Sequence, residues 1–345
     1  MNWSQVFQQS FTEMISYTAI IYCLAAIGLN LQFGYTGLLN FGQAGFAAIG
    51  GYAIAVTTTT FTMNFWLGLV FGIVGAVLFG LLLGVPTLRL RADYLAIVTI
   101  AASEIIRLVL RSVTFQKWLG GSDGISGQYA AAFYRLNPFT GLHVNIWIFE
   151  SSSSGVSLLN GLIHWSTNDA WIVLVGWILV AVMSTLLWLL TRSPWGRVIK
   201  SIREDEDAAR SLGRNVFIFK IQALILGGIA GALAGMVFAI EAQSVQADNY
   251  STDLTFFAYA ILILGGTARV FGPVVGSMIF WFLLVFVEQI LTEGVAAGWI
   301  PPSILTSDQV GQVRFMVVGL ALMLLMIFRP QGIFGDRKEL ALDAR

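Results

Sequence analysis

Long apolar runs separated by short polar segments fill most of the chain. The runs are continuous and lack the alternation of a barrel strand, so they predict helices. A helix needs about 20 apolar residues to cross a bilayer. The pattern therefore predicts an all-α, polytopic transmembrane helical bundle with about nine spans, in a range of about eight to ten, at residues 14–33, 41–60, 64–84, 93–112, 170–190, 217–240, 253–270, 274–292 and 312–328.

Two segments stand out from this regular pattern. The span at 41–60 is rich in glycine and threonine, and we expect either a full span or a broken, re-entrant one. Non-helical backbone is tolerated at membrane depth where protein buries it or where it lines a cavity. We interpret 1–345 as a single transmembrane domain. Its longest connection, 113–169, is expected to form a cap or lid with one or two short helices.

Lysine and arginine gather on one side of the predicted bundle. Thirteen of the 19 fall in 85–92, in 191–216, at Arg269 or in the C-terminal tail, against two in 113–169. Basic residues are enriched in the cytoplasmic connections of membrane proteins. The distribution predicts a cytoplasmic C-terminus and an N-terminus outside, with the acidic connection 241–253 also outside.

Composition limits the possible chemistry. The chain is 57% hydrophobic and 11% charged, against about 25% charged in soluble domains. Cys23 is the only cysteine and allows no disulfide within the chain, and the two histidines lie together in 113–169. No GxxxxGK[ST] phosphate-binding loop occurs. We expect no catalytic site, no metal, no cofactor and no nucleic-acid partner, so any ATP is hydrolysed by another chain. Residues 1–13 lack Lys and Arg, so no cleavable signal peptide is expected.

A polar island at 191–220 lies between two apolar runs. It contains seven Lys or Arg residues and four consecutive acids at 204–207. After Pro194 it reads as helix, turn, helix, with the small residues Ala208 and Ala209 on the second helix and Gly213 suited to end it. Such a helix fits a groove on a partner protein. An ordinary charged cytoplasmic loop explains the same composition.

The island resembles the EAA loop of ABC importer permeases, in which E-A-A is followed after three residues by glycine. The matching residues here are D-A-A-R-S-L-G at 207–213, with Asp207 where the pattern has glutamate. The whole stretch 193–213 and four others are similar, in the same order, to LivM-type permeases of branched-chain amino acid importers. These four are LRLRADYLAIVTIAASEIIRLVL (88–110), GGSDGIS (120–126), ILGGTARVFGP (263–273) and FRPQGIF (328–334). Residues 128–169 show no such resemblance.

The resemblance implies an assembly in the bacterial inner membrane. Besides membrane lipid, the expected partners are a second, LivH-type permease, two cytoplasmic ABC ATPases that bind the ATP, and a periplasmic substrate-binding protein. The expected cargo is a branched-chain or other neutral amino acid. The resemblance also implies that the island couples the permease to the ATPase, through Arg203, Glu204, Asp205, Glu206, Asp207, Ala208, Ala209 and Gly213.

The segment 28–52 holds seven glycines. Glycine lets backbone approach a ligand or another helix closely, and uncharged hydrogen-bonding groups lie between these glycines. Such groups suit an amino-acid zwitterion crossing a pore. Close helix packing explains the glycines equally well. The residues that we predict to line a substrate pathway here are Gly34, Tyr35, Thr36, Asn40 and Gln43.

Charged residues also occur inside predicted spans. Glu104, Arg107 and Arg111 share one face of the span 93–112, and charges at membrane depth are costly. Either Glu104 and Arg107 form a structural pair, or they flank the pathway and gate it. The later stripe of Gly227, Gly231 and Gly235 is interpreted as a helix-packing face.

Three other functions compete with the amino-acid importer. Related permeases of the same importer class carry urea or short amides. A secondary transporter needs an intramembrane acid for its coupling ion, and Glu104 is the candidate. A passive channel needs no energy source. The last two leave the ordered motifs unexplained.

Overall fold

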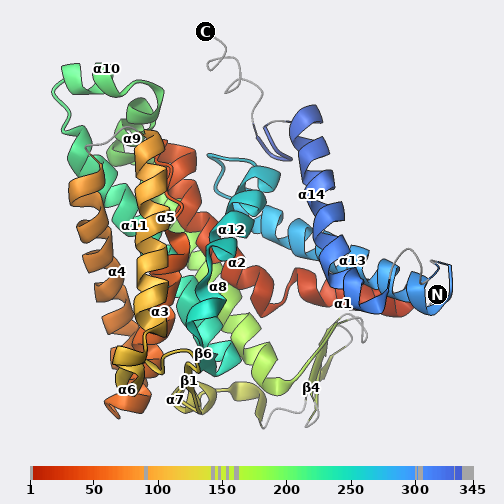
Figure 1. Ribbon diagram of the computed structural model, residues 1–345. Helices are drawn as coiled ribbons and strands as arrows, with labels where there is room; N and C mark the ends of the chain where they lie inside the picture. The colour runs from red at the N-terminus through yellow and green to blue at the C-terminus, as the bar shows by residue number, and fades with distance from the viewer. Residues whose placement is uncertain are drawn as a thin grey trace.

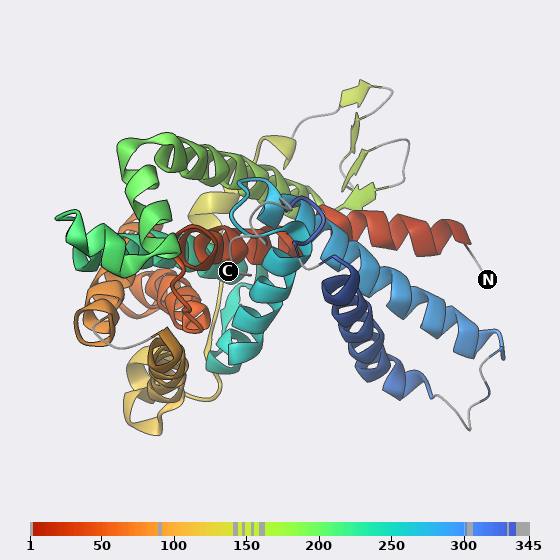
Figure 2. The same ribbon diagram turned by 90° about the horizontal axis from the view of Figure 1, so that it is seen from above.

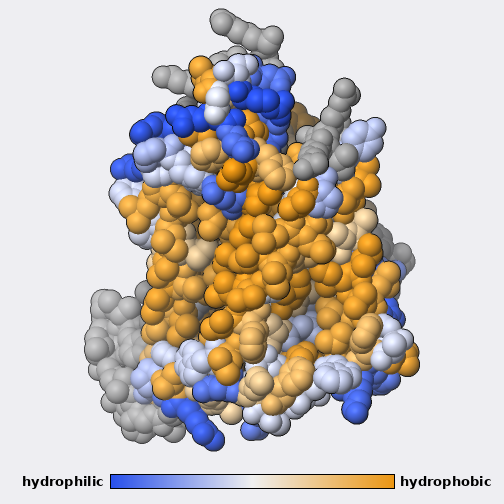
Figure 3. Space-filling view, turned by 90° about the vertical axis from the view of Figure 1, so that its left-hand side faces the viewer, coloured by the Kyte–Doolittle hydropathy of each residue, from blue (hydrophilic) through white to orange (hydrophobic). Residues whose placement is uncertain are grey.

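The computed structural model is built mainly of helices, most of which run between two ends of the molecule (Figure 1). One end carries α9 (Pro194–Glu204) and α10 (Glu206–Ser211); the other carries α6 (Gln116–Leu119) and α7 (Ala131–Tyr134). An apolar band separates these ends (Figure 3). The structure describes residues 3–88, 92–140, 144–146, 149–152, 155–158, 163–299, 301, 306–329 and 331–335.

The longer helices make up most of the molecule. Two of them continue as short π-helical segments: η1 (Asn30–Tyr35) follows α2, and η2 (Val56–Thr60) follows α3. Among the described residues, 3-10 turns lie in the connections at η3 (Val113–Phe115), η4 (Pro138–Thr140), η5 (Ala247–Tyr250) and η6 (Ser307–Gln309). The longer helices are α1 (Trp3–Met14), α2 (Tyr17–Leu29), α3 (Gln43–Ala55), α4 (Phe65–Thr87), α5 (Ala92–Arg111), α8 (Thr167–Arg192), α11 (Val216–Ala242), α12 (Thr252–Gly265), α13 (Gly272–Ala296) and α14 (Val310–Phe328).

The helical, multi-pass class predicted from the sequence is confirmed. Among the described residues, six helical stretches are long and apolar enough to cross a membrane: Trp3–Tyr35, Phe65–Thr87, Thr167–Arg192, Val216–Ala242, Gly272–Ala296 and Val310–Phe328. The predicted spans 41–60, 93–112 and 253–270 correspond to α3, α5 and α12. Of these, α3 and α12 are short, and α5 contains several charged residues. The count of nine spans stays a prediction.

The helix preceding α3 is interrupted rather than continuous with it. The backbone is non-helical over 37–42, and α3 begins only at Gln43. Gly37 has a φ of +72°, which glycine adopts without steric cost. The side-chain Oδ1 of Asn40 accepts a hydrogen bond from the Gly42 N–H at 2.8 Å, and such local bonds compete with helix formation. The polar and glycine residues predicted for a pathway therefore sit around a helix break.

Helix α11 forms the centre of the bundle and packs against α2, α3 and α4. A Cβ on Gly235 would stand 1.8 Å from the carbonyl oxygen of Ala47, and one on Gly227 would stand 2.6 Å from that of Gly28. Only glycine fits at such distances, so the backbones themselves are in contact. The interpretation of the glycine stripe as a packing face is confirmed.

At the end opposite α10, the connection 113–169 pairs with the chain that follows α11. Strand β1 (Ile125–Ser126) lies antiparallel to β6 (Ser244–Val245). The hydroxyl of Tyr129 donates to the Ala239 carbonyl oxygen at 2.7 Å. Burial raises the pKa of Tyr129, so this hydroxyl stays a neutral donor. The segments 113–128 and 241–253 therefore form one surface.

The rest of this connection contains a feature that the sequence pattern did not predict. Besides the short helices α6 and α7, it forms an antiparallel four-stranded sheet in chain order. The serine-rich stretch reads as a loop by composition, whereas part of it pairs as a hairpin. The strands are β2 (Val144–Ile146), β3 (Phe149–Ser152), β4 (Gly155–Leu158) and β5 (Ile163–Trp165).

The C-terminal motif 328–334 returns to the end of α12. The N–H of Ile333 donates to the Leu264 carbonyl oxygen at 3.0 Å, and that of Phe334 donates to the Gly265 carbonyl oxygen at 3.2 Å. These two bonds satisfy carbonyls that a helix end leaves without partners. Two of the motifs recognised in the sequence, 263–273 and 328–334, thus form one structural unit, which we name the tail clamp.

Candidate functional site

The polar island folds into two short helices that continue from α8. Ser193 ends α8 and caps α9: its Oγ donates to the Leu190 carbonyl oxygen at 2.7 Å and accepts from the Gly196 N–H at 3.3 Å. Pro194 occupies the first turn of α9, where a missing N–H costs nothing. The predicted start of a helix after Pro194 is confirmed. We name residues 194–214 the coupling segment.

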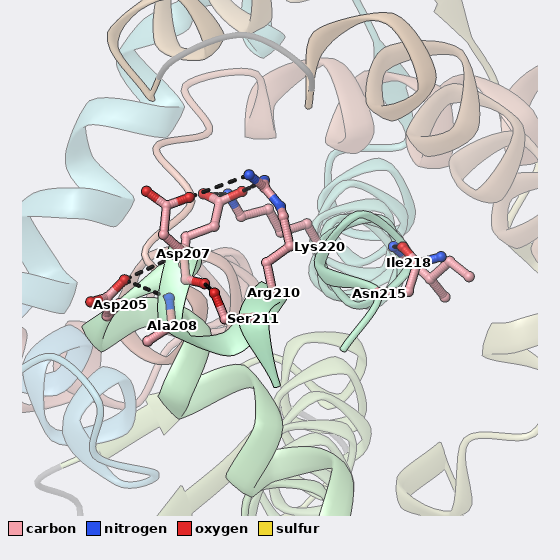
Figure 4. Close-up of polar contacts among 9 residues, drawn as sticks. Asp205, Asp207, Ala208, Arg210, Ser211, Asn215, Ile218 and Lys220 are labelled. Carbon is pink, nitrogen blue, oxygen red and sulfur yellow. Dashed lines mark hydrogen bonds and ion pairs between the residues drawn. The ribbon is translucent and has the colours of Figure 1, made fainter. Parts of the chain in front are cut away.

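Asp205 separates the two helices of the coupling segment. Its backbone is extended, with φ −153° and ψ 109°. Its Oδ1 accepts hydrogen bonds from the N–H groups of Asp207 and Ala208, both at 2.9 Å (Figure 4). These N–H groups begin α10 and have no partner within the helix, so the aspartate is a typical N-cap. Among the four consecutive acids at 204–207, Asp205 therefore has a structural role, because it caps α10.

Gly213 ends α10, as the sequence predicted. Its φ is +77°. The Gly213 N–H donates to the Arg210 carbonyl oxygen at 3.0 Å, and the Arg214 N–H reaches back to the Ala209 carbonyl oxygen at 3.3 Å. This pair of bonds is the Schellman arrangement that commonly ends a helix with a left-handed glycine.

One ion pair joins α10 to α11, and two others lie within α10. Glu206 Oε1 lies 2.9 Å from Arg210 Nη2, and Glu206 Oε2 lies 2.5 Å from Lys220 Nζ on α11. Arg210 also lies 3.3 Å from Asp207. Exposed pairs of this kind contribute roughly 0.2–1 kcal/mol each. The Lys220 side chain is only 15% exposed, so its pair with Glu206 is the best shielded and defines how α10 sits.

The two alanines of the EAA-like stretch differ in exposure. Ala209 is 3% exposed and packs with Ile202 of α9 and Val216 of α11. Ala208 is exposed, and the neighbouring Leu212 is 81% exposed. The sequence pattern predicted one small face for a partner, formed by both alanines. In the folded chain, Ala208 and Leu212 form the accessible part, whereas Ala209 holds the helix in place.

The coupling segment touches the predicted pathway segment directly. The Arg203 side chain lies over Gly37, where a Cβ would stand 3.4 Å from Arg203 Cγ. The Lys200 Nζ lies 5.5 Å from the centre of the Tyr35 ring, within reach of a cation–π interaction. Helix α9 is therefore in direct contact with the chain at the helix break.

The amides around the break are buried and mostly hydrogen-bonded within the chain. Asn40 Nδ2 donates to Gln32 Oε1 at 2.9 Å, and Gln32 Nε2 donates to the Leu224 carbonyl oxygen of α11 at 2.9 Å. Gln43 Nε2 donates to the Gly227 carbonyl oxygen at 3.0 Å, while Gln43 Oε1 has no hydrogen-bond partner among the described residues. These bonds tie the broken helix to the bundle centre.

The remaining predicted pathway residues also lie inside the chain. Tyr35 and Thr36 are buried, and the Thr36 hydroxyl donates to the Leu31 carbonyl oxygen at 2.8 Å. Gly34 faces Asn30, whose Oδ1 would stand 2.2 Å from a Cβ at that position. Their assignment to a substrate pathway stays a prediction.

Two residues near the break escaped the sequence analysis. Asn30 bridges to the loop after α12: its Oδ1 accepts from the Ala268 N–H at 2.9 Å, and its Nδ2 donates to the Arg269 carbonyl oxygen at 2.7 Å. Gln32 is hydrogen-bonded to both Asn40 and the Leu224 carbonyl oxygen, as described above. Both are amides inside an otherwise apolar run, and that isolation is the signal that could have revealed them.

Glu104 and Arg107 form the structural pair that one of the two interpretations expected. Arg107 Nε lies 3.0 Å from both Glu104 oxygens. Arg107 also pairs with Asp248, and Arg111 lies 3.4 Å from the same carboxylate. The charges thus join α5 to the turn after β6, on the end of the molecule that carries β1. This geometry favours a structural role and leaves the gating role as a prediction.

Together these features define a multi-pass helical membrane protein with a peripheral helix pair in contact with a broken helix. Residues 11–328 match the family described as the permease component of branched-chain amino acid transport systems, and the chain belongs to this family. It is 31% identical over 320 residues to the high-affinity branched-chain amino acid transport system permease protein LivM of Salmonella typhimurium (strain LT2), covering 92% of this chain and 69% of that protein.

Two further relatives agree. The LivM protein of Escherichia coli (strain K12) is 30% identical over 322 residues, which are 93% of this chain and 69% of that protein. The probable LivM protein of Methanocaldococcus jannaschii is 25% identical over 353 aligned residues, covering 92% and 91% of the two chains. The resemblance inferred from the motifs is confirmed. It favours a transport permease over the secondary transporter and the channel.

Proposed function

We propose that this chain is the permease subunit of an ATP-driven ABC importer that moves branched-chain or other neutral amino acids across the bacterial inner membrane. Membership of the permease family supports the class. The observation that carries the mechanism is the contact of Arg203 and Lys200 with Gly37 and Tyr35, because it joins the coupling segment to the helix break.

The other components of the importer supply what this chain does not. They are a LivH-type second permease, two cytoplasmic ABC ATPases that bind and hydrolyse the ATP, and a periplasmic substrate-binding protein. The coupling segment faces the cytoplasm with the C-terminus, and the surface formed by 113–128 and 241–253 faces outward with the N-terminus. The segregation of Lys and Arg supports this orientation, and so does the location of the two segments at opposite ends (Figure 1).

In this mechanism the ATPase binds α10 and displaces it when ATP binds to the ATPase. Glu206 and Lys220 transmit the motion to α11, and α9 transmits it to the break at 37–42. The spans then switch the pathway between outward and inward access. Gly34 and Thr36 lie beside this break and Asn40 lies within it, where a small change in backbone alters what the pathway presents to an amino acid.

The test is to co-express the chain with its neighbouring permease and ATPases and to measure the ATPase that copurifies in membranes. Ala208→Arg places a large side chain on the exposed part of α10. We expect it to reduce bound ATPase about tenfold or more, because overpacking a contact costs about 1–3 kcal/mol. Ser201→Arg, which adds the same group to the exposed face of α9, is the matched control and should bind ATPase normally.

A third variant separates docking from folding. Ala209→Arg buries a charge in the packing of α10 and should unfold this helix, which limited proteolysis detects, whereas Ala208→Arg should leave it intact. Normal ATPase binding by Ala208→Arg would reduce the coupling segment to a charged loop. Amino-acid uptake by the chain alone, driven by a proton or sodium gradient, would contradict the proposed function altogether.

A further inference from the structure

A cavity of about 710 Å³ lies between α1, α13 and α14. Helix α1 runs across the bundle at a level between its two ends (Figure 1), and α1, α13 and α14 project together from the remaining helices (Figure 2). The wall formed by α1 is entirely polar: its residues recur every three or four positions and so share one helical face, at Gln5, Gln8, Gln9, Thr12 and Glu13.

Aromatic contacts hold this polar face in place. Phe7 and Phe11 of α1 lie 5.6 Å from Phe286 and 5.3 Å from Phe282 of α13, measured between ring centres. Such ring pairs stabilise helix contacts beyond the apolar area that they bury. Since the rings fix one side of α1 against α13, the glutamine side remains directed to the cavity that it lines.

The charges that line the cavity do not balance. Glu288 of α13 is paired with Arg314 of α14. The Glu13 carboxylate accepts a hydrogen bond from Ser16 Oγ at 2.8 Å, and among the described residues no cation pairs with it. On the opposite wall, Trp281 Nε1 and Arg314 Nε are buried donors without a hydrogen-bond partner in the described part of the chain. The cavity thus offers one spare acid and two spare donors.

This arrangement is costly unless a ligand uses it. Polar and ionisable groups at membrane depth mark substrate or ion sites by default, and buried donors are normally satisfied. We propose that the cavity binds a small zwitterion, with its ammonium group at Glu13 and its anionic group at the wall of Trp281 and Arg314. Two sources share this chemistry: a free amino acid, which rests on the proposed function, and the headgroup of an ethanolamine phospholipid.

The experiment uses the complete permease heterodimer in phosphatidylcholine nanodiscs, with radiolabelled L-leucine as the first probe. If the free amino acid is the ligand, binding is saturable without any binding protein. Glu13→Gln should then weaken it about tenfold or more, because a charge-assisted hydrogen bond contributes about 1.5–3 kcal/mol. Asp308→Asn removes an exposed acid outside the cavity and should bind leucine like the wild type.

The second arm adds phosphatidylethanolamine and measures retained lipid by native mass spectrometry. If the headgroup is the ligand, leucine does not bind, and the wild type retains more of this lipid than Glu13→Gln does. Binding of neither probe would overturn the proposal. So would a Glu13→Gln heterodimer that falls apart, since the face would then be a subunit contact. ATPase copurification is scored on the same samples, so a failure of the importer mechanism is recognised separately.

Discussion

Gly213 shows how a single backbone position shapes the surface offered to a partner. A Cβ at this residue would meet nothing within 4 Å, so sterics with the surroundings do not require glycine. The requirement comes from the φ of +77°, because a left-handed conformation costs most other residues about 1–2 kcal/mol.

Gly213→Ala should therefore loosen the end of α10 without disturbing its packing. We expect faster hydrogen exchange at the amides of Gly213 and Arg214, which close the helix, and little change in α11. Gly213→Asn is the control, since asparagine accepts the left-handed region more readily. Equal protection in the alanine variant would show that the helix end does not depend on this conformation.

The exposure of the two alanines could not be predicted from the sequence. Residues 208 and 209 are identical in type and adjacent, and the motif treats them alike, yet Ala209 is 3% exposed and Ala208 is exposed. A helix of six residues is too short to show a periodic pattern. The packing of Ala209 against Ile202 and Val216 is tertiary, and only the folded chain reveals it.

At the scale of elements, the central feature is the contact of α11 with α2 and α3. Gly227, Gly231 and Gly235 have a recognisable spacing, so this interface could be predicted. The helix break at 37–42 could be suspected but not located. Its position depends on partners far along the chain: Gln32 bonds to Leu224, and the Tyr259 hydroxyl donates to the Asn40 carbonyl oxygen at 2.9 Å.

Gly235→Val should prevent α11 from reaching α3, because its Cβ would stand 1.8 Å from a backbone oxygen that has no room to move. We expect loss of the folded, monodisperse chain in detergent, or a melting temperature lowered by several degrees. Gly319→Val in α14, where a Cβ would meet nothing within 4 Å, is the matched control. Wild-type stability of Gly235→Val would contradict the close packing.

At the scale of the whole molecule, the distribution of Lys and Arg along the chain agrees with the two ends of the fold. The segment 191–216, which holds six of the Lys and Arg residues, lies at one end, and the described parts of the connection 113–169 lie at the other (Figure 1). The sequence could predict this division because loop charge follows simple electrostatic rules. It could not predict the sheet β2–β5, whose strands pair through backbone groups and leave little trace in composition.

Single cysteines at the two ends test the orientation. With Cys23 buried, Trp118→Cys and Leu212→Cys introduce accessible thiols at residues that are 50% and 81% exposed. A maleimide that does not cross membranes should label Trp118→Cys in cells with a permeabilised outer membrane. Leu212→Cys should react only after the inner membrane is opened. The reverse pattern would invert the proposed orientation.

The tail clamp has a consequence for how the protein is made. The end of α12 acquires its last two backbone hydrogen bonds from Ile333 and Phe334, which come after α13 and α14 in the chain. Chains fold from the N-terminus during synthesis, so α12 enters the membrane long before its clamp exists. This corner of the permease is therefore completed only after α13 and α14 have been made, and a message that stops before codon 333 should yield a chain with an unfinished α12.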